Sequence, residues 1–331
     1  MLKVLVIGGA GYVGSHMIKK LKEEGSSVTT LDDLSNGRRE AVLFGDFVQG
    51  DFGDRAILDI VLSRGFDVVM HFASFINVAD SIIHPDIYYR NNVVSTLVLL
   101  DSMRRHGVNK LIFSSTAAVF GVPKYIPIDE QHRKVPINPY GNTKLIVEEI
   151  LNDYRRAFGF ESVCLRYFNA AGADPAGLLG ECHEPETHLI PLVLQAASGR
   201  RESVSVFGRN HDTPDGTCIR DYVHVTDLCA AHWLALIRLM NGTADHSYNL
   251  GNGDGYSVQE IIKTVEHVTG KSIKSVDLPK RDGDPACLVA DSTRARRQLG
   301  WQPSYPELST MIEHAWGWER SLCASSIRVL Y

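Results

Sequence analysis

A tyrosine and a lysine four residues apart, Tyr140 and Lys144, form the pattern in this 331-residue sequence with the clearest capacity for chemistry. On a helix, residues at this spacing lie on one face, and Pro139 suits the first turn of such a helix. An ammonium group near a phenol favours the phenolate, so Lys144 is expected to lower the pKa of Tyr140 and make it a general base for an alcohol. The same spacing also fits an ordinary surface pair, so the choice between a catalytic pair and a surface pair depends on the surrounding elements.

A glycine-rich turn near the N-terminus has the sequence context that binds a dinucleotide. A short apolar run over 3–7 predicts a buried strand, and a helical pattern over 15–21 follows the turn. Gly8 permits the tight turn, Gly11 lets a pyrophosphate approach the helix N-terminus, and Gly14 lets the helix pack closely. The spacing is Gly-x-x-Gly-x-x-Gly, and its position between strand and helix predicts a dinucleotide site.

An acidic residue, Asp32, ends the second expected strand over 27–31. A carboxylate at this position binds the ribose diol of an adenosine. It would also repel a 2′-phosphate, and no arginine follows before Arg38. The sequence therefore favours NAD over NADP.

Three hydroxyl residues, Ser114 to Thr116, end a further expected strand over 110–116. In an open parallel sheet, ligands bind outside the carboxyl ends of the strands. These hydroxyls are therefore either turn caps or contacts to a bound polar group.

The alternation of strands and helices predicts an α/β fold with a Rossmann-type, doubly wound parallel sheet. Residues 1–170 are expected to form the dinucleotide-binding domain. Residues 171–331 contain shorter elements and more loops, and they predict a smaller, mixed α/β substrate-binding lobe. The segment around 217–241 is expected to pack back on the first domain. Further expected elements are strands at 47–52, 66–74 and 161–169 and helices at 86–106 and 140–158.

Composition excludes several classes of protein. The net charge of -5 argues against a nucleic-acid surface. No apolar stretch approaches the roughly 18 residues typical of a membrane span, and the short apolar start does not fit a signal peptide. The six scattered cysteines include no Cys-x-x-Cys pair, which favours reduced thiols and a cytoplasmic location.

One loop gathers side chains of metal-ligand type. Their spacing matches no common structural zinc pattern and a proline interrupts it, so we expect a polar loop and no metal. These residues are Cys182, His183, Glu184, Glu186 and His188, with Pro185 between them.

The motifs together resemble the extended short-chain dehydrogenase/reductase superfamily. Within it, the ordered set is similar to the UDP-glucose/UDP-galactose 4-epimerase family, over nearly the whole chain up to about Arg320. The matching segments are the glycine turn, Asn91-Asn92, Tyr140-x-x-x-Lys144, Arg166 to Gly172, Arg220 to Val225, Tyr248 to Gly251 and Arg281 to Asp284.

This resemblance implies an isomerase of nucleotide-sugar and galactose metabolism that uses NAD without consuming it. Tyr140 would take the proton of the sugar 4′-hydroxyl, Thr116 would hydrogen-bond that hydroxyl, and Lys144 would hold the nicotinamide ribose. The implied cofactor contacts are Gly8, Gly11, Tyr12, Val13, Gly14, Asp32, Asn36, Asp51, Phe52, Phe72, Ala73, Asn91, Ser114, Tyr140, Lys144 and Tyr167. The implied UDP-sugar contacts are Thr116, Tyr140, Phe168, Asn169, His188, Leu189, Phe207, Arg220, Tyr222, Arg281, Asp284 and Leu288. The family's dimers imply a homodimer in which the helices at 86–106 and 140–158 pair.

Three positions depart from the family pattern. Thr116 replaces a common serine and keeps the hydroxyl, whereas Ile76 stands where some members have a lysine near the nicotinamide. Leu288 aligns with a tyrosine that walls the sugar in some members, and a smaller wall would admit an N-acetyl group.

Three alternatives remain open at this point. A UDP-N-acetylglucosamine or UDP-pentose 4-epimerase would share every motif. A sugar-nucleotide 4,6-dehydratase would have an Asp-Glu pair where this chain has Ala117-Ala118. A non-enzymatic dinucleotide sensor would have no need of the Tyr140–Lys144 pair. Arg220 could also form a structural ion pair with Asp221 or Asp227 instead of binding a diphosphate.

Overall fold

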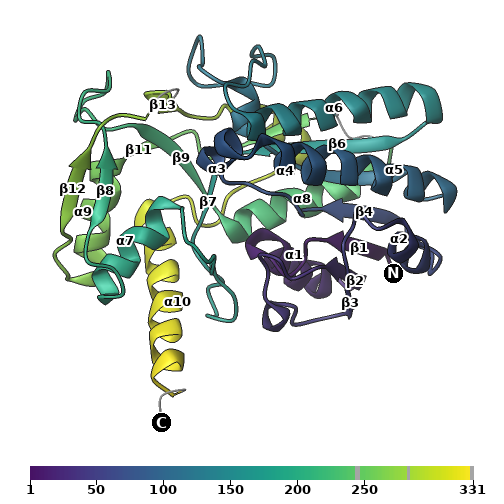
Figure 1. Cartoon of the computed structure of the whole chain (residues 1–331), viewed down its shortest axis with the longest axis horizontal. Coiled ribbons are helices and arrows are strands. Elements are labelled where there is room, and N and C mark those ends of the chain that lie inside the picture. The colour runs from purple at the N-terminus through teal and green to yellow at the C-terminus, as the bar shows by residue number, and fades with distance from the viewer. Residues whose placement is uncertain (243–246, 282–283, 329–331) are drawn as a thin grey trace.

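The computed structural model describes residues 1–242, 247–281 and 284–328, with side chains described to Cys323. A seven-stranded parallel sheet forms the larger layer, in the order β10-β6-β5-β4-β1-β2-β3 (Figure 1). Strands β1 to β6 lie in the order typical of a dinucleotide-binding sheet. The seventh strand, β10, pairs with β6 at the edge of the sheet. The strands are β1 (Lys3–Ile7), β2 (Ser27–Asp32), β3 (Asp46–Gln49), β4 (Val68–His71), β5 (Lys110–Thr116), β6 (Glu161–Tyr167) and β10 (Ser247–Leu250).

Helices cover both faces of this sheet, as the doubly wound prediction requires. On one face, α1 and α8 pack on side chains such as Val6 and Val163. On the other, α2, α5 and α6 pack on side chains such as Leu5 and Leu111. These helices are α1 (Tyr12–Glu23), α2 (Arg55–Leu62), α5 (Ser95–Arg105), α6 (Pro139–Phe158) and α8 (Val225–Met240). Two segments from the second half of the chain thus complete the first layer: β10 is a strand of this sheet, and α8 packs on one of its faces.

The expected helix over 86–106 is interrupted. It consists of α4 (Pro85–Tyr89), a π-helical turn η2 (Arg90–Val94) and α5. Asn92, buried in that turn, accepts a hydrogen bond from the Phe75 amide at 2.9 Å and donates to the Phe75 carbonyl at 3.0 Å. It also donates to the Thr143 hydroxyl at 3.1 Å, so the turn is tied to α6. Such π-bulges occur often at functional sites.

The smaller lobe surrounds its own core, in which residues such as Val193, Ile261 and Met311 are fully buried. Its strands form two small sheets, one of β8 and β12 and one of β7, β9, β11 and β13. The strands are β7 (Asn169–Ala171), β8 (Val204–Phe207), β9 (Ile219–His224), β11 (Gly255–Ser257), β12 (Ser275–Leu278) and β13 (Cys287–Leu288), and the helices are α7 (Leu189–Ser198), α9 (Val258–Thr269) and α10 (Leu308–Arg328). The remaining short elements are η1 (Arg39–Ala41), α3 (Val78–Ile83), η3 (Ala117–Phe120) and η4 (Ala295–Leu299).

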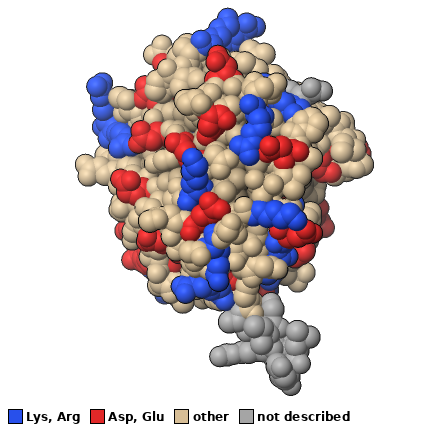
Figure 2. All heavy atoms as spheres, turned by 90° about the vertical axis from the view of Figure 1, so that its left-hand side faces the viewer, with Lys and Arg blue, Asp and Glu red and all other residues tan. Residues whose placement is uncertain are grey.

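The surface carries charges of both signs. Figure 2 shows acidic and basic side chains interspersed over one face, without a broad basic field. Among the described helices, none has the length and apolarity needed to cross a membrane.

Candidate active site

Helix α6 begins at the pattern that suggested chemistry. The Asn138 side chain accepts a hydrogen bond from the Gly141 amide at 2.8 Å and caps the helix, and Pro139 occupies its first turn. This local geometry places Tyr140 in the first turn and Lys144 one turn later, next to the carboxyl end of β5. Tyr140 there shares a hydrogen bond with the hydroxyl of Thr116. The structure thus brings together the tyrosine and the hydroxyl residue that the sequence singled out.

Lys144 extends toward the carboxyl end of β5. Its side chain is buried, and its ammonium donates to the Ser114 carbonyl at 2.9 Å and lies 4.9 Å from the centre of the Phe113 ring. Burial lowers the pKa of Lys144 to about 7. This lysine therefore binds its proton weakly when no anion lies nearby.

The pKa of Tyr140 departs from the expectation. Burial raises the pKa of Tyr140 to about 12, and the hydrogen bond with Thr116 offsets this rise only in part. The predicted lowering of this pKa is wrong, because burial disfavours the phenolate more than the hydrogen bond with Thr116 favours it. A phenolate in this position needs a further positive charge close by.

A buried ion pair supports α6 below the tyrosine and the lysine. Glu148, one turn beyond Lys144, receives two hydrogen bonds from Arg166 of β6, at 2.8 and 2.7 Å. Ser115 of β5 donates to the same carboxylate at 2.7 Å. The sequence analysis missed Glu148, although its spacing from Tyr140 and Lys144 places all three on one helix face. This network fixes α6 to the two strands whose ends form the site.

Removing this carboxylate is expected to destabilise the fold. Glu148→Gln leaves the buried Arg166 without its counter-ion, which costs about 3–5 kcal/mol. Chemical denaturation of both proteins with bound ligands removed measures the loss, and Glu149→Gln, at the exposed neighbouring position, is the control. Equal stability of the Glu148 variant and the control would show that the pair does not hold α6.

The three glycines of the turn differ in the space that surrounds them: Gly8 and Gly14 are closely packed, and Gly11 is open. A Cβ atom at Gly14 would lie 2.2 Å from the Gly8 carbonyl oxygen, and one at Gly8 would lie 2.4 Å from the Ala73 amide. At Gly11 the same atom would meet only the Gly8 carbonyl oxygen, at 3.6 Å. Gly11 also precedes α1 without a side-chain cap, and the first turn of α1 has no acidic residue. The N-terminus of α1 is therefore open to an anion.

The other expected cofactor residues gather at the same end of the sheet. Asp32 ends β2, and its carboxylate accepts from the amides of Ala10 and Leu34 at 2.8 and 2.9 Å. Burial raises the pKa of Asp32. Asp51 follows β3, Phe52 is buried, and Phe72 and Ala73 follow β4. Tyr167 shares a hydrogen bond with Ser114 across β5 and β6.

On the side of the smaller lobe, two arginines approach the expected substrate region. Arg220 forms an ion pair with Asp284, and the Arg281 guanidinium lies 3.6 Å from the centre of the Phe207 ring. The alternative ion pairs of Arg220 with Asp221 or Asp227 are not among the contacts that the structure describes, because Asp284 takes this role.

The remaining expected substrate residues line the same lobe. Leu288 pairs with Arg220 in the sheet and packs with Phe168, and the Asn169 side chain donates to the Asp221 carbonyl at 2.9 Å. Tyr222 is buried opposite Asn169. His188 and Leu189 begin α7.

Comparisons with known proteins show what the whole chain is similar to. A model of the NAD dependent epimerase/dehydratase family matches residues 4–251. The chain is 49% identical to a UDP-glucose 4-epimerase of Halalkalibacterium halodurans over 320 residues, which cover 96% of each chain. It is also similar to the crystal structure of UDP-glucose 4-epimerase from Brucella ovis in complex with NAD, with a TM-score of 0.93, 46% identity and coverage of 96% and 99%. A UDP-Glc/GlcNAc 4-epimerase from Campylobacter jejuni has a TM-score of 0.85 at 36% identity, with coverage of 97% and 100%.

Proposed function

The chain belongs to the NAD dependent epimerase/dehydratase family, and we propose that it interconverts UDP-galactose and UDP-glucose by NAD-dependent epimerisation at C4. It is an isomerase of galactose-type sugar metabolism. The observation that carries the proposal is the hydrogen bond between Thr116 and Tyr140, at the same edge of the parallel sheet as the glycine turn. An alcohol held at this point would meet both a proton acceptor and a hydrogen-bond donor.

The residues present fit NAD. The open space at Gly11 and the uncapped N-terminus of α1 suit a pyrophosphate, and Asp32 suits an unphosphorylated ribose. When bound, the nicotinamide supplies hydride transfer to and from the sugar. Lys144 would hold the nicotinamide ribose.

Tyr140 moves the proton. As phenolate it takes the proton of the sugar 4′-hydroxyl, and as phenol it returns that proton to the 4-keto group. Burial opposes the phenolate, so the positive charge of the oxidised cofactor and that of Lys144 must together lower the pKa of Tyr140. Thr116 would hydrogen-bond the sugar 4′-hydroxyl and position it for proton transfer to Tyr140.

The substrate must be held firmly at the nucleotide and loosely at the sugar, because the 4-keto sugar has to present its other face. Arg220 and Arg281 suit the diphosphate, since guanidinium groups bind phosphate oxygens with two N–H groups. Arg220 would exchange its bond with Asp284 for a phosphate oxygen. Asn169 and the backbone at His188 and Leu189 would bind the nucleotide.

We also propose a role for each domain, a dimeric assembly and a cellular location. Residues 1–170 hold NAD, residues 171–331 hold the UDP-sugar, and the segment 217–241 supports the first domain through α8. A homodimer through the helices around 86–106 and 140–158 and a cytoplasmic location complete the proposal. Sedimentation at several protein concentrations tests the dimer.

Incubation with a panel of UDP-sugars tests the proposed reaction. We expect purified protein to convert UDP-galactose into UDP-glucose in a coupled assay without added NAD. Absence of product, with NAD and UDP-sugar both shown to be bound, would contradict it.

Leu288 supports a second activity, on UDP-N-acetylglucosamine. It is partly buried among apolar side chains beside Phe168, where a tyrosine would leave less space. We expect wild-type protein to epimerise both substrate pairs, and Leu288→Tyr to lose the acetylated pair selectively. One methylene in an apolar pocket is worth about 1–3 kcal/mol, or roughly 10–200-fold in relative kcat/KM. The N-acetyl group is larger than a methylene, so we expect a change of at least this size.

The comparison that matters is between the two substrate pairs within each protein. Leu288→Met keeps an apolar side chain of similar volume and is the control. If wild-type protein does not turn over the acetylated pair, the second activity is wrong while the first still stands.

A further inference from the structure

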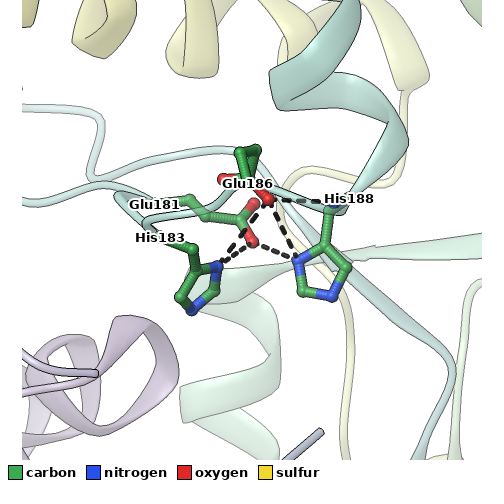
Figure 3. Close-up of side chains that lie close together, drawn as sticks. All are labelled: Glu181, His183, Glu186 and His188. Atoms are coloured by element: carbon green, nitrogen blue, oxygen red, sulfur yellow. Dashed lines mark hydrogen bonds and ion pairs between the residues drawn. The ribbon is translucent and has the colours of Figure 1, made fainter. Parts of the chain in front are cut away.

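Four side chains of the loop before α7 converge on one point. They are Glu181, His183, Glu186 and His188, and one ligand-type atom from each lies within 4.8 Å of the others (Figure 3). The sequence analysis had grouped Cys182 and Glu184 with the histidines, but the structure places Glu181 in the cluster instead. We refer to these four residues as the His-Glu cluster.

The distances in the cluster suit a tetrahedral ion. The Nδ1 atom of His183 lies 3.1 Å from a Glu181 oxygen and 3.8 Å from a Glu186 oxygen. The Nδ1 atom of His188 contacts the same Glu181 oxygen and lies 3.9 Å from that of Glu186. Metal–ligand bonds of about 2.0–2.1 Å in a tetrahedron separate ligand atoms by about 3.3–3.4 Å. The separations of 3.1, 3.8 and 3.9 Å lie around this value, whereas His188 and Glu181 are in direct contact and would move apart to admit an ion.

The two carboxylates of the cluster are buried, and their negative charges need positive charge nearby. The carboxylates of Glu181 and Glu186 are only 5% and 4% exposed. Two buried carboxylates repel each other and lose hydration, so each requires a compensating cation. Among the ion pairs that the structure describes, those to these carboxylates come from the two histidines. Two protonated imidazoles balance both charges, and a divalent ion that replaced their protons would do the same.

Contacts behind the ligands hold them in place. Glu186 accepts hydrogen bonds from the amides of Thr187 and His188, at 2.7 and 2.9 Å. The Glu181 carbonyl accepts from the Trp318 indole of α10 at 2.9 Å. Such outer contacts orient metal ligands in known sites. They also connect the cluster to α10 and to the start of α7.

We propose that Glu181, His183, Glu186 and His188 form a structural site for a divalent transition-metal ion, with zinc as the ion it fits best. Two nitrogen and two oxygen ligands in a tetrahedral arrangement suit Zn²⁺. All four ligands come from the protein, so the ion would have a structural and not a catalytic role. It would close the loop over 181–188 next to the residues that begin α7. The inference does not depend on the proposed reaction.

Metal analysis of the full-length protein tests the site. Protein with bound NAD, purified without immobilised metal and dialysed against metal-free buffer, is expected to retain about one zinc per chain by mass spectrometry. After chelator treatment, calorimetric titration with Zn²⁺ should show one site.

Matched variants connect the ion to the cluster. His183→Asn and Glu186→Gln are expected to lose stoichiometric zinc, whereas Glu184→Gln, exposed in the same loop, keeps it. Circular dichroism and the content of bound NAD show whether each variant is folded. Absence of stoichiometric Zn²⁺ binding by stripped wild-type protein would overturn the proposal, and so would equal zinc content in the Glu184 and Glu186 variants. Neither readout requires epimerase activity.

Discussion

Tyr140→Phe is expected to lose epimerase activity by about 10²–10⁴-fold, the usual contribution of a positioned acid–base group. The substitution removes only the hydroxyl that shares a hydrogen bond with Thr116. The ring remains, so the fold and the bound NAD should be retained. Steady-state kcat with UDP-galactose and the NAD content of the denatured protein measure the two effects.

A second tyrosine of α6 provides the matched control. The ring of Tyr154 packs on Phe158 and Phe160 at the far end of the helix. Tyr154→Phe removes the same atom from the same helix and should leave kcat within about twofold, since substitutions away from such sites usually have small effects. If Tyr140→Phe and Tyr154→Phe retained similar activity, the proton would have another acceptor.

Gly11→Ala is expected to separate cofactor binding from folding. Its Cβ atom has room in the protein without ligands, with only the Gly8 carbonyl oxygen at 3.6 Å. The methyl group would occupy the space through which the pyrophosphate approaches the backbone. An extra methyl group in a close-fitting site costs about 1–3 kcal/mol, or roughly 5- to 150-fold in the Kd for NAD.

Gly14→Ala should have a different result. Its Cβ atom would lie 2.2 Å from the Gly8 carbonyl oxygen and 2.9 Å from the Gly9 Cα atom, so the start of α1 must move. We expect this variant to lose thermal stability as well as NAD, whereas the stripped Gly11 variant melts close to stripped wild-type protein. Calorimetry of the stripped proteins and fluorescence titration with NAD distinguish the two. An unchanged Kd for Gly11→Ala would show that no phosphate approaches that residue.

Local signals explain why much of the fold could be predicted from the sequence. The strand over 110–116 and the start of α6 were predicted where the structure has them, because an apolar run and a proline next to a capping residue depend on near neighbours. The helix over 86–106 was predicted as continuous and is interrupted, because Asn92 bonds to Phe75, which lies far away in sequence. The placement of β10 beside β6 likewise depends on a distant pairing.

The electrostatics of the site could not be predicted in this way. Spacing put Tyr140 and Lys144 on one face, but the direction of each pKa shift is decided by burial and by the carbonyl of Ser114. The Arg220–Asp284 pair joins residues 64 positions apart. Glu181 had no distinguishing local pattern and became visible only when the loop was folded.

The fate of the hydrogen at C4 tests the central claim most directly. UDP-galactose that carries deuterium at C4 of the sugar is incubated with the protein and its own bound NAD, and the product is analysed by NMR and mass spectrometry. The account predicts UDP-glucose that keeps the deuterium at C4, because the hydrogen leaves one face and returns to the other within one site. Product with protium from solvent at C4, or no product from protein that binds both NAD and the UDP-sugar, would contradict it.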